Sequence, residues 1–465
     1  MDTVIEIAEA VRSGERKAVE VVEECLACIS EKNALLNAFV HLDDQGALAR
    51  AREIDDAVAA GVDPGPLAGV PLGVKDLEDC AGMPTSHGSV MYLDRGPVER
   101  DSIHVGRLRA AGAIPLGKTA APELGTLQYT RTVAFGTTRN PWNPDKTPGG
   151  SSGGTAAAVA AGMVPMGTAS DGGGSTRIPA SFSGLFGLKP SFGRIPSEHP
   201  CTSQTAVFGA LTTTVTDSAR HLDVVHGPDD RDRTSLPPSG VRYEEVVEVL
   251  SPVGLRVAWS PDLGFAAVDP EVEAVTSAAA AALIDAAGME RVERSVLLTD
   301  PIRTWMSQGG IDLWAEHDCA RWLERKDELT PFVRSSLEIT SEATTPQLAK
   351  GFRHRWKLEE EVAEIFSDVD VLLTPTTAVP AFVAEGPPPD EIDGRRVHVG
   401  MSVPFTMAAN LCWNPAASVP AGFTSEGLPV GLQIMGRRHA DDVVLRLSRI
   451  FEQIRPWPRT TNQLL

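Results

Sequence analysis

No apolar run in this sequence reaches the roughly 18 residues that a membrane-spanning helix needs. The N-terminal stretch MDTVIEIAEAVRSGERKAVEVVEEC also lacks the basic-then-apolar pattern of a secretory signal. We therefore expect a cytoplasmic protein with no membrane partner. Basic residues are fewer than acidic ones, 42 against 62, which gives a formal net charge of -20. Such a charge disfavours a polyanionic partner such as nucleic acid.

Cysteine and histidine show no metal-binding pattern. Of the six cysteines, only Cys25 and Cys28 form a C-x-x-C pair, and neither a second pair nor an H-x-x-x-H pattern completes a zinc site. None of the ten histidines belongs to an H-E-x-x-H motif. The pair falls within a helical pattern, so we interpret both cysteines as buried residues of a helix face and expect no metal.

Helical and strand-like patterns alternate along the chain, which indicates an α/β fold around a mixed central sheet. Surface helices are expected at residues 4–32 and 45–60, and an Ala-rich helix at 270–288. The other expected elements are a strand that ends at Lys75, a helix, turn and strand within 105–119, a helix at 155–162, strands at 163–170, 254–260 and 368–377, and a hairpin of 415–423 with 428–436. No long Pro/Ser linker, repeat or block of like charge divides the 465 residues, so we expect one large domain.

Two short motifs match nucleotide-binding and hydrolase patterns, but their surroundings disfavour both. Residues 112–119 (GAIPLGKT) have the letters of a phosphate-binding P-loop, yet the four middle residues are expected to form a strand rather than a loop. Residues 150–154 (GSSGG) match G-x-S-x-G, which would make Ser152 the nucleophile of an α/β-hydrolase elbow. That elbow follows a strand directly, whereas the irregular segment NPWNPDKTPGG precedes this motif.

Two glycine-rich loops, each with serine inside it, lie close together in TPGGSSGGTAAAVAAGMVPMGTASDGGGSTR (residues 147–177). Together with PLGVKD upstream, GSTRIPASFSGLFGLKPSFGRIP, DVLLTPT and GLPVGLQIMG, they resemble the amidase signature family over nearly the whole chain. The resemblance implies the amidase-signature fold, in which helices cover a large mixed sheet on both sides. It further implies a single domain of residues 1–465, with the catalytic motifs in 61–200 and a variable segment at 300–360 that helps to cover the site.

The resemblance also implies a Ser–Ser–Lys triad. The nucleophile corresponds to Ser175, the bridging serine to Ser151 and the lysine to Lys75. Physical chemistry agrees with these roles, because a serine hydroxyl needs a base to take its proton. A lysine serves as that base only when neutral, which burial favours, and Lys75 ends an apolar run. A bridging hydroxyl can accept from one partner and donate to the other.

The glycines before the nucleophile are expected to form an oxyanion hole. Gly172, Gly173 and Gly174, with Ser175, leave backbone N–H groups free to point at a carbonyl oxygen. We interpret the flanking Asp171 and Arg177 as a pair that holds this loop. Ser170 stands where the family often has threonine, so a hydroxyl is kept. The resemblance implies in addition a cis peptide bond between Gly150 and Ser151.

The implied activity is hydrolysis of a carbon–nitrogen bond in a neutral carboxamide through an acyl-enzyme, with no metal or organic cofactor. Members of the family act on primary amides, anilides, cyclic amides, esters or carbamates, and the sequence leaves this choice open. One alternative is an amidotransferase component that acts on acylated tRNA with partner subunits; another is an ester- or carbamate-cleaving member. The expected partner is a small-molecule amide, and the oligomeric state is left open, with a homodimer as one option.

The family's substrate-lining stretch corresponds to residues 125–130, which carry no charge. Within it we assign substrate binding to Gly125, Thr126, Gln128 and Tyr129, and we expect the amide of Gln128 and the hydroxyl of Tyr129 to supply polar groups in a hydrophobic pocket. Four of the eight tryptophans fall in the variable segment, where they either cover the site or pack a helical subregion: Trp305, Trp314, Trp322 and Trp356.

Overall fold

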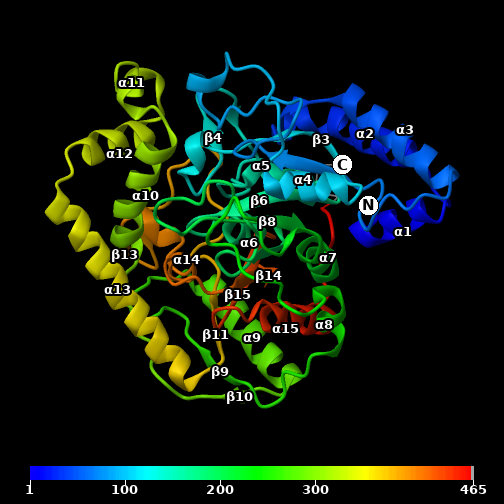
Figure 1. Cartoon of the computed structure of the whole chain (residues 1–465). Coiled ribbons are helices and arrows are strands. Elements are labelled where there is room, and N and C mark those ends of the chain that lie inside the picture. Colours follow the sequence, from blue (N-terminus) through cyan, green and yellow to red (C-terminus); the bar gives the residue numbers. More distant parts are fainter. Residues whose placement is uncertain (462–465) are drawn as a thin grey trace.

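The computed structural model describes residues 1–461 and is organised around an eleven-stranded mixed sheet with helices on both sides (Figure 1). In spatial order the strands are β1 (Phe39–Leu42), β3 (Ile114–Thr119), β2 (Pro71–Lys75), β6 (Met166–Asp171), β8 (Val207–Thr212), β7 (Phe186–Lys189), β14 (Ala416–Phe423), β15 (Pro429–Gly436), β11 (Val371–Pro375), β9 (Arg256–Trp259) and β10 (Glu290–Arg291). Strand β2 is parallel to both of its neighbours, whereas β14 and β15 form an antiparallel hairpin. The α/β class and the mixed sheet expected from the sequence are confirmed.

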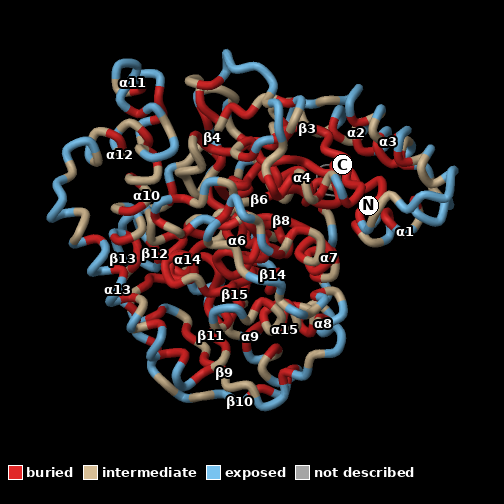
Figure 2. Tube along the Cα trace, in the orientation of Figure 1, coloured by how far each residue is buried: buried red, intermediate tan, exposed pale blue. Residues whose placement is uncertain are grey.

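Helices surround this sheet, and two further pairs of short strands lie outside it: β4 (Arg131–Thr132) with β5 (Gly136–Thr137), and β12 (Glu391–Ile392) with β13 (Arg395–Arg396). The helices are α1 (Val4–Arg12), α2 (Ala18–Leu36), α3 (Asp44–Ala59), α4 (Ile103–Ala110), α5 (Gly153–Ala160), α6 (Arg177–Ser183), α7 (Val215–Val225), α8 (Tyr243–Val249), α9 (Pro270–Ala287), α10 (Ile302–Glu316), α11 (Cys319–Leu323), α12 (Pro331–Ser341), α13 (Thr345–Asp368), α14 (Met407–Leu411) and α15 (Asp441–Ile454). Figure 2 shows buried residues along the central sheet and α6, and exposed residues along the outer helices α12 and α13.

The parallel pairing of β2 with β6 determines where the predicted site lies. Leu72 pairs with Met166 and Gly73 with Gly167. Since parallel strands end at the same edge of a sheet, Lys75 at the end of β2 lies beside the end of β6, and the second glycine-rich loop follows β6 directly.

Helix α5 brings the first glycine-rich loop to the same edge. It consists of small residues and is buried throughout. Its first-turn amide at Gly154 donates to Ala120 O, just beyond β3, at 2.9 Å. A Cβ atom at Gly154 would lie 2.2 Å from Ala120 N and 2.6 Å from Ala38 O, so only glycine permits this approach. Ser151, immediately before α5, is thereby held against the end of β2.

The N-terminal helical pattern proves to be two helices rather than one. Helix α1 ends at Arg12 and α2 begins at Ala18, because Gly14 adopts a φ of 75° that ends the first helix. The predicted strand at 163–170 starts only at Met166. The strand that ends at Lys75 and the C-terminal hairpin occur as expected. Of the paired cysteines, Cys25 is buried as predicted, whereas Cys28 is only half-buried.

The surroundings of the two misleading motifs are as the sequence indicates. The middle of the P-loop-like stretch lies in β3, and the next element is a short 3-10 turn at Glu123–Gly125 rather than a helix. The stretch before GSSGG contains only isolated bridges, at Asn140 and at Lys146. Neither a P-loop nor a nucleophile elbow is formed.

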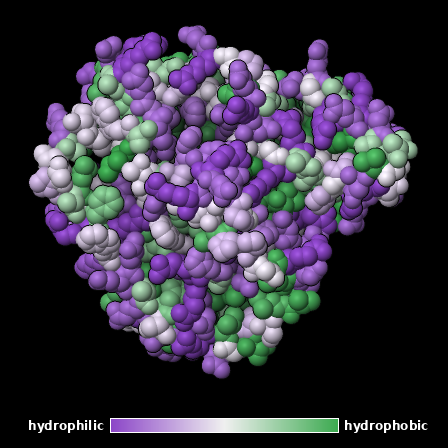
Figure 3. All heavy atoms as spheres, viewed as in Figure 1, coloured by the Kyte–Doolittle hydropathy of each residue, from purple (hydrophilic) through white to green (hydrophobic). Residues whose placement is uncertain are grey.

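Within residues 1–461, no helix combines the length and the apolar character that crossing a membrane requires. Figure 3 shows that the visible face is mostly hydrophilic, with hydrophobic side chains gathered in separate small areas.

The close contact at Gly154 yields a test of the fold. Gly154→Ala forces a methyl group against the backbone of Ala120 and Ala38, so we expect a loss of about 1–3 kcal/mol in the free energy of unfolding. The matched control is Gly309→Ala in α10, where a Cβ atom meets nothing within 4 Å. That variant should be neutral or about 1 kcal/mol more stable. Urea unfolding of both variants checks this, and equal stabilities would contradict the described packing of α5.

Candidate active site

Lys75 is buried at the end of β2, with its amine among three oxygen atoms. Its Nζ lies 2.7 Å from Ser151 Oγ, 2.9 Å from Ser170 Oγ and 3.4 Å from Ser170 O. Burial lowers the pKa of Lys75 to about 7, although the charges of Asp171 and Glu78 act in the opposite direction. Its side chain therefore loses its proton near neutral pH, unlike an ordinary lysine.

The two acceptors of Ser170 orient the amine of Lys75. A neutral amine has two N–H groups and one lone pair. If these hydrogens go to Ser170 Oγ and Ser170 O, the lone pair is left for the hydroxyl of Ser151. This arrangement allows Lys75 to accept a proton from Ser151.

Ser151 sits in a tightly packed loop. The Gly150–Ser151 peptide is cis, as the resemblance implies, and the side chain of Ser151 is buried. A Cβ atom at Gly150 would lie 2.5 Å from Leu127 O and 2.7 Å from Tyr129 N. The loop is therefore pressed against the predicted substrate-lining stretch.

Ser175 lies next to this pair but is not yet linked to it by its hydroxyl. The amide of Ser152 donates to Ser175 O at 3.2 Å, which places Ser175 beside the loop of Ser151. Ser175 is half-buried, and among residues 1–461 its hydroxyl makes no hydrogen bond. The structure thus joins Lys75 to Ser151 and leaves the hydroxyl of Ser175 free. Catalytic hydrogen bonds are often longer without substrate and tighten when it binds.

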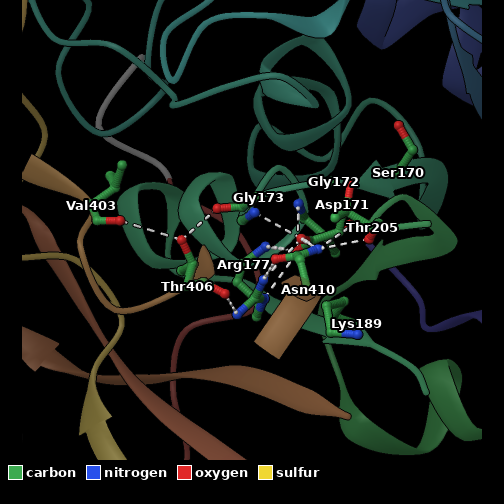
Figure 4. Close-up of polar contacts among 12 residues, drawn as sticks. Ser170, Asp171, Gly172, Gly173, Arg177, Lys189, Thr205, Val403, Thr406 and Asn410 are labelled. Carbon is green, nitrogen blue, oxygen red and sulfur yellow. Dashed lines mark hydrogen bonds and ion pairs between the residues drawn. The ribbon is translucent and has the colours of Figure 1, made fainter. Parts of the chain in front are cut away.

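Asp171 and Arg177 form a fully buried ion pair behind the glycine loop (Figure 4). Arg177 Nε and Nη2 donate to the two carboxylate oxygens at 3.0 and 2.9 Å. Burial alone would raise the pKa of Asp171, but the Arg177 charge and its hydrogen bonds hold that pKa well below the usual range. Asn410 donates to Asp171 Oδ1 and accepts from Arg177, so the pair is also tied to α14. The pair holds the loop as the sequence analysis proposes.

The predicted set of free amides needs one correction. The amide of Gly174 donates to Asp171 Oδ1 at 2.7 Å, because the loop turns back onto that carboxylate. The prediction of a free N–H group is therefore wrong for Gly174. In the described part of the chain, the amides of Gly172, Gly173 and Ser175 donate to no acceptor of the protein. These three amides can donate to a bound oxygen atom.

Gly125 and Tyr129 lie close to the loop of Ser151. A Cβ atom at Gly125 would be 3.3 Å from Ser151 Oγ. The ring of Tyr129 packs edge-on against Phe382, with centroids 6.1 Å apart. Burial raises the pKa of the Tyr129 phenol, which stays protonated at neutral pH. Both residues are therefore available to contact a ligand at Ser151.

The polar side chains of Thr126 and Gln128 are engaged by the protein itself. Thr126 Oγ1 donates to Glu123 O at 2.9 Å. Gln128 donates to Val399 O at 3.0 Å and accepts from the Ser402 hydroxyl at 2.8 Å. The expectation that Gln128 supplies a free polar group is wrong for this conformation, because its amide is satisfied at both ends.

The four tryptophans of the 300–360 segment differ in position. Trp305 donates from Nε1 to Gly172 O at 2.7 Å and so lies on the glycine loop. Trp314 donates to Thr340 within the helical segment, and Trp322 is buried in a separate cluster there. Trp356 is 59% exposed. Only Trp305 contacts the candidate site.

Three residues of this region escape sequence reasoning: Ser170 as a partner of Lys75, and Thr406 and Asn410 as partners of the glycine loop. Thr406 Oγ1 donates to Gly173 O at 2.6 Å (Figure 4). No motif marks the stretch MSVPFTMAANLC that contains the last two, since their contacts reach across more than two hundred residues.

Comparison with known proteins agrees with this geometry. The family model described as Amidase matches residues 20–445. An acylamidase of Rhodococcus erythropolis is 36% identical over 456 residues, which covers 97% of this chain and 95% of that protein. One chain of the glutamyl-tRNA(Gln) amidotransferase of a Synechococcus species is 34% identical, and the match covers 96% of both proteins. The crystal structure of a bacterial aryl acylamidase of the amidase signature family superposes with a TM-score of 0.92 at 29% identity, covering 98% of this chain and 96% of the other.

The buried ion pair predicts a strong and pH-dependent contribution to stability. Asp171→Asn leaves the Arg177 charge buried without its partner, so we expect a loss of about 3–5 kcal/mol in the free energy of unfolding. Glu53→Gln, which removes the exposed partner of Arg50, should change stability by less than about 1 kcal/mol.

Urea unfolding at several pH values measures both effects. Because the folded-state pKa of Asp171 lies below its unfolded value, its contribution is present above about pH 4 and is lost as the pH falls. Equal losses in the two variants at neutral pH would contradict this account.

Proposed function

Because this chain belongs to the amidase signature family and is an amide hydrolase, we propose that Ser175, Ser151 and Lys75 cleave neutral carboxamides through an acyl-enzyme. The observation that carries this proposal is the 2.7 Å contact between Lys75 Nζ and Ser151 Oγ, made by a buried lysine with a pKa of about 7. Such a lysine is neutral in a large share of molecules at neutral pH and can act as a base.

In the proposed reaction, Ser175 Oγ attacks the carbonyl carbon of the amide. Its proton passes to Ser151 Oγ while the proton of Ser151 passes to Lys75 Nζ. The free amides of Gly172, Gly173 and Ser175 stabilise the negative oxygen of the tetrahedral intermediate. The C–N bond then breaks as a proton returns from Lys75 through Ser151 to the leaving nitrogen. Water attacks the resulting ester of Ser175 and releases the carboxylic acid.

We further propose that residues 1–465 act as one domain, in which residues 61–200 hold the catalytic core and residues 300–360 cover the site. The single sheet that takes strands from Phe39 to Gly436 supports the first part. Two contacts of the cover support the second. Trp305 bonds to Gly172 O, and Thr330 donates to the buried Glu123 carboxylate at 2.7 Å.

The substrate class follows from the absence of charge around the serines. Residues 125–130 carry no charge, and the aromatic rings of Tyr129 and Trp305 lie beside the two loops. A charged acyl group buried there would lack a partner. The net charge of -20 also disfavours tRNA, the substrate of the amidotransferase alternative.

Substitution of the three proposed catalytic residues tests the triad. Lys75→Ala, Ser151→Ala and Ser175→Ala should each lower kcat by about 10³-fold or more while circular dichroism stays unchanged. The neighbouring Ser152→Ala is the matched control and should lower kcat by less than about tenfold. An essential Ser152 with a dispensable Ser151 would overturn the assignment.

The pH dependence of kcat/KM tests the base. Lys75 must be neutral to accept a proton, so activity should rise as the pH increases and level off above its pKa of about 7. The profile is measured with the wild-type enzyme under conditions in which the chemical step limits the rate. A flat profile between about pH 6 and pH 9 would count against a lysine base.

A pair of substrates tests the preference for uncharged amides. We expect kcat/KM for a neutral aryl amide to exceed that for glutamine by at least about tenfold, since the carboxylate of glutamine finds no partner in the pocket. An aliphatic primary amide and a carbamate complete the panel. A clear preference for glutamine would reject the proposal and favour the amidotransferase alternative.

A further inference from the structure

Trp305 contacts the one peptide group of the glycine loop whose orientation no other residue fixes. Its indole Nε1 donates to Gly172 O at 2.7 Å. A Cβ atom at Gly173 would lie 2.6 Å from atoms of the indole ring, so the ring rests directly on this loop. Trp305 reaches the loop from the first turn of α10, far from it in the sequence.

The geometry of a trans peptide links this contact to the free amide of Gly173. The peptide between Gly172 and Gly173 is trans, and in a trans peptide the C=O and the following N–H point in opposite directions. Since the indole holds the carbonyl of Gly172, the N–H of Gly173 points away from Trp305. No acceptor among residues 1–461 takes that N–H group.

The next peptide of the loop is fixed by different groups. The carbonyl of Gly173 accepts from Thr406 Oγ1 at 2.6 Å, and the amide of Gly174 donates to Asp171 Oδ1 at 2.7 Å. That peptide is therefore held at both ends (Figure 4). The peptide between Gly172 and Gly173 has only the indole to hold its carbonyl, and glycine on both sides leaves its rotation free.

Helix α10 is well placed to hold the indole still. Gln308 and Asp312 follow Trp305 on one face of the helix, at the spacing expected for neighbouring turns. Gln308 Oε1 accepts from the buried Arg355 at 3.0 Å. Asp312 accepts from Ser203 N at 2.7 Å, at the segment that leads into β8. Trp305 thus projects from a helix bonded to the core at two positions.

We propose that Trp305 is a positioning residue for the oxyanion hole: its indole N–H orients the peptide between Gly172 and Gly173 so that the Gly173 amide donates to the negative oxygen of the intermediate. The inference rests on the proposed function at Ser175. Because the oxygen becomes negative only after attack, this contact acts on the transition state more than on the bound substrate. Its loss lowers kcat and leaves KM nearly unchanged.

The test compares Trp305→Phe with Trp314→Phe. Both changes remove an indole N–H from α10 and keep an aromatic ring, and the indole of Trp314 donates to Thr340 Oγ1 at 2.8 Å, away from the loop. We expect Trp305→Phe to lower kcat about 10- to 100-fold with KM within about twofold. Trp314→Phe should keep the wild-type kcat, and thermal unfolding should show similar stability for both.

A second measurement separates positioning from a merely structural role. An aldehyde analogue of the substrate adds to a catalytic serine and forms an oxyanion, whereas a non-cleavable amide analogue does not. Trp305→Phe should weaken inhibition by the aldehyde by the same factor as kcat and leave inhibition by the amide analogue unchanged.

Equal kcat in the two Phe variants, or equal weakening of both inhibitors, would overturn the inference while leaving the triad intact. Failure of the proposed function has a different signature, namely a wild-type enzyme whose amide hydrolysis does not depend on Ser175.

Discussion

The site depends on keeping one amine out of water at the edge of the sheet. Burial of Lys75 lowers its pKa to about 7, whereas the nearby carboxylates of Asp171 and Glu78 favour the charged form. Asp171 does not neutralise this effect, because its own charge is taken up by Arg177 in a fully buried pair. The ion pair therefore has two consequences: it holds the glycine loop, and it limits the attraction that would keep Lys75 protonated.

The same constraint explains why the site draws on distant parts of the chain. Strand β2 brings Lys75, the loop before α5 brings Ser151, and the loop after β6 brings Ser175. These three come from neighbouring strands and a short helix packed on them. The groups that hold the last loop in place, such as Thr406 and Trp305, come from outside this core. Catalytic chemistry and its support are thus supplied by separate segments.

The sequence predicts the local part of this arrangement well. An apolar run indicates the strand that ends at Lys75, and glycine-rich stretches indicate both loops, because these features depend on neighbouring residues alone. The bond from Gly174 to Asp171, the engagement of Gln128 by Ser402, and the contact of Trp305 with Gly172 could not be predicted. Each depends on the direction of one side chain or peptide group in the packed molecule, which hydrophobic periodicity does not encode.

The central claim is that Ser175 carries the acyl group, and direct observation of that intermediate tests it most simply. The protein is mixed with a slowly hydrolysed aryl ester, quenched in acid and analysed by mass spectrometry after proteolysis. The account predicts a mass increase equal to the acyl group on the peptide that contains Ser175, absent from Ser175→Ala and accumulating less at low pH. An acyl group found on Ser152, or an adduct that forms equally well in Ser175→Ala, would contradict it.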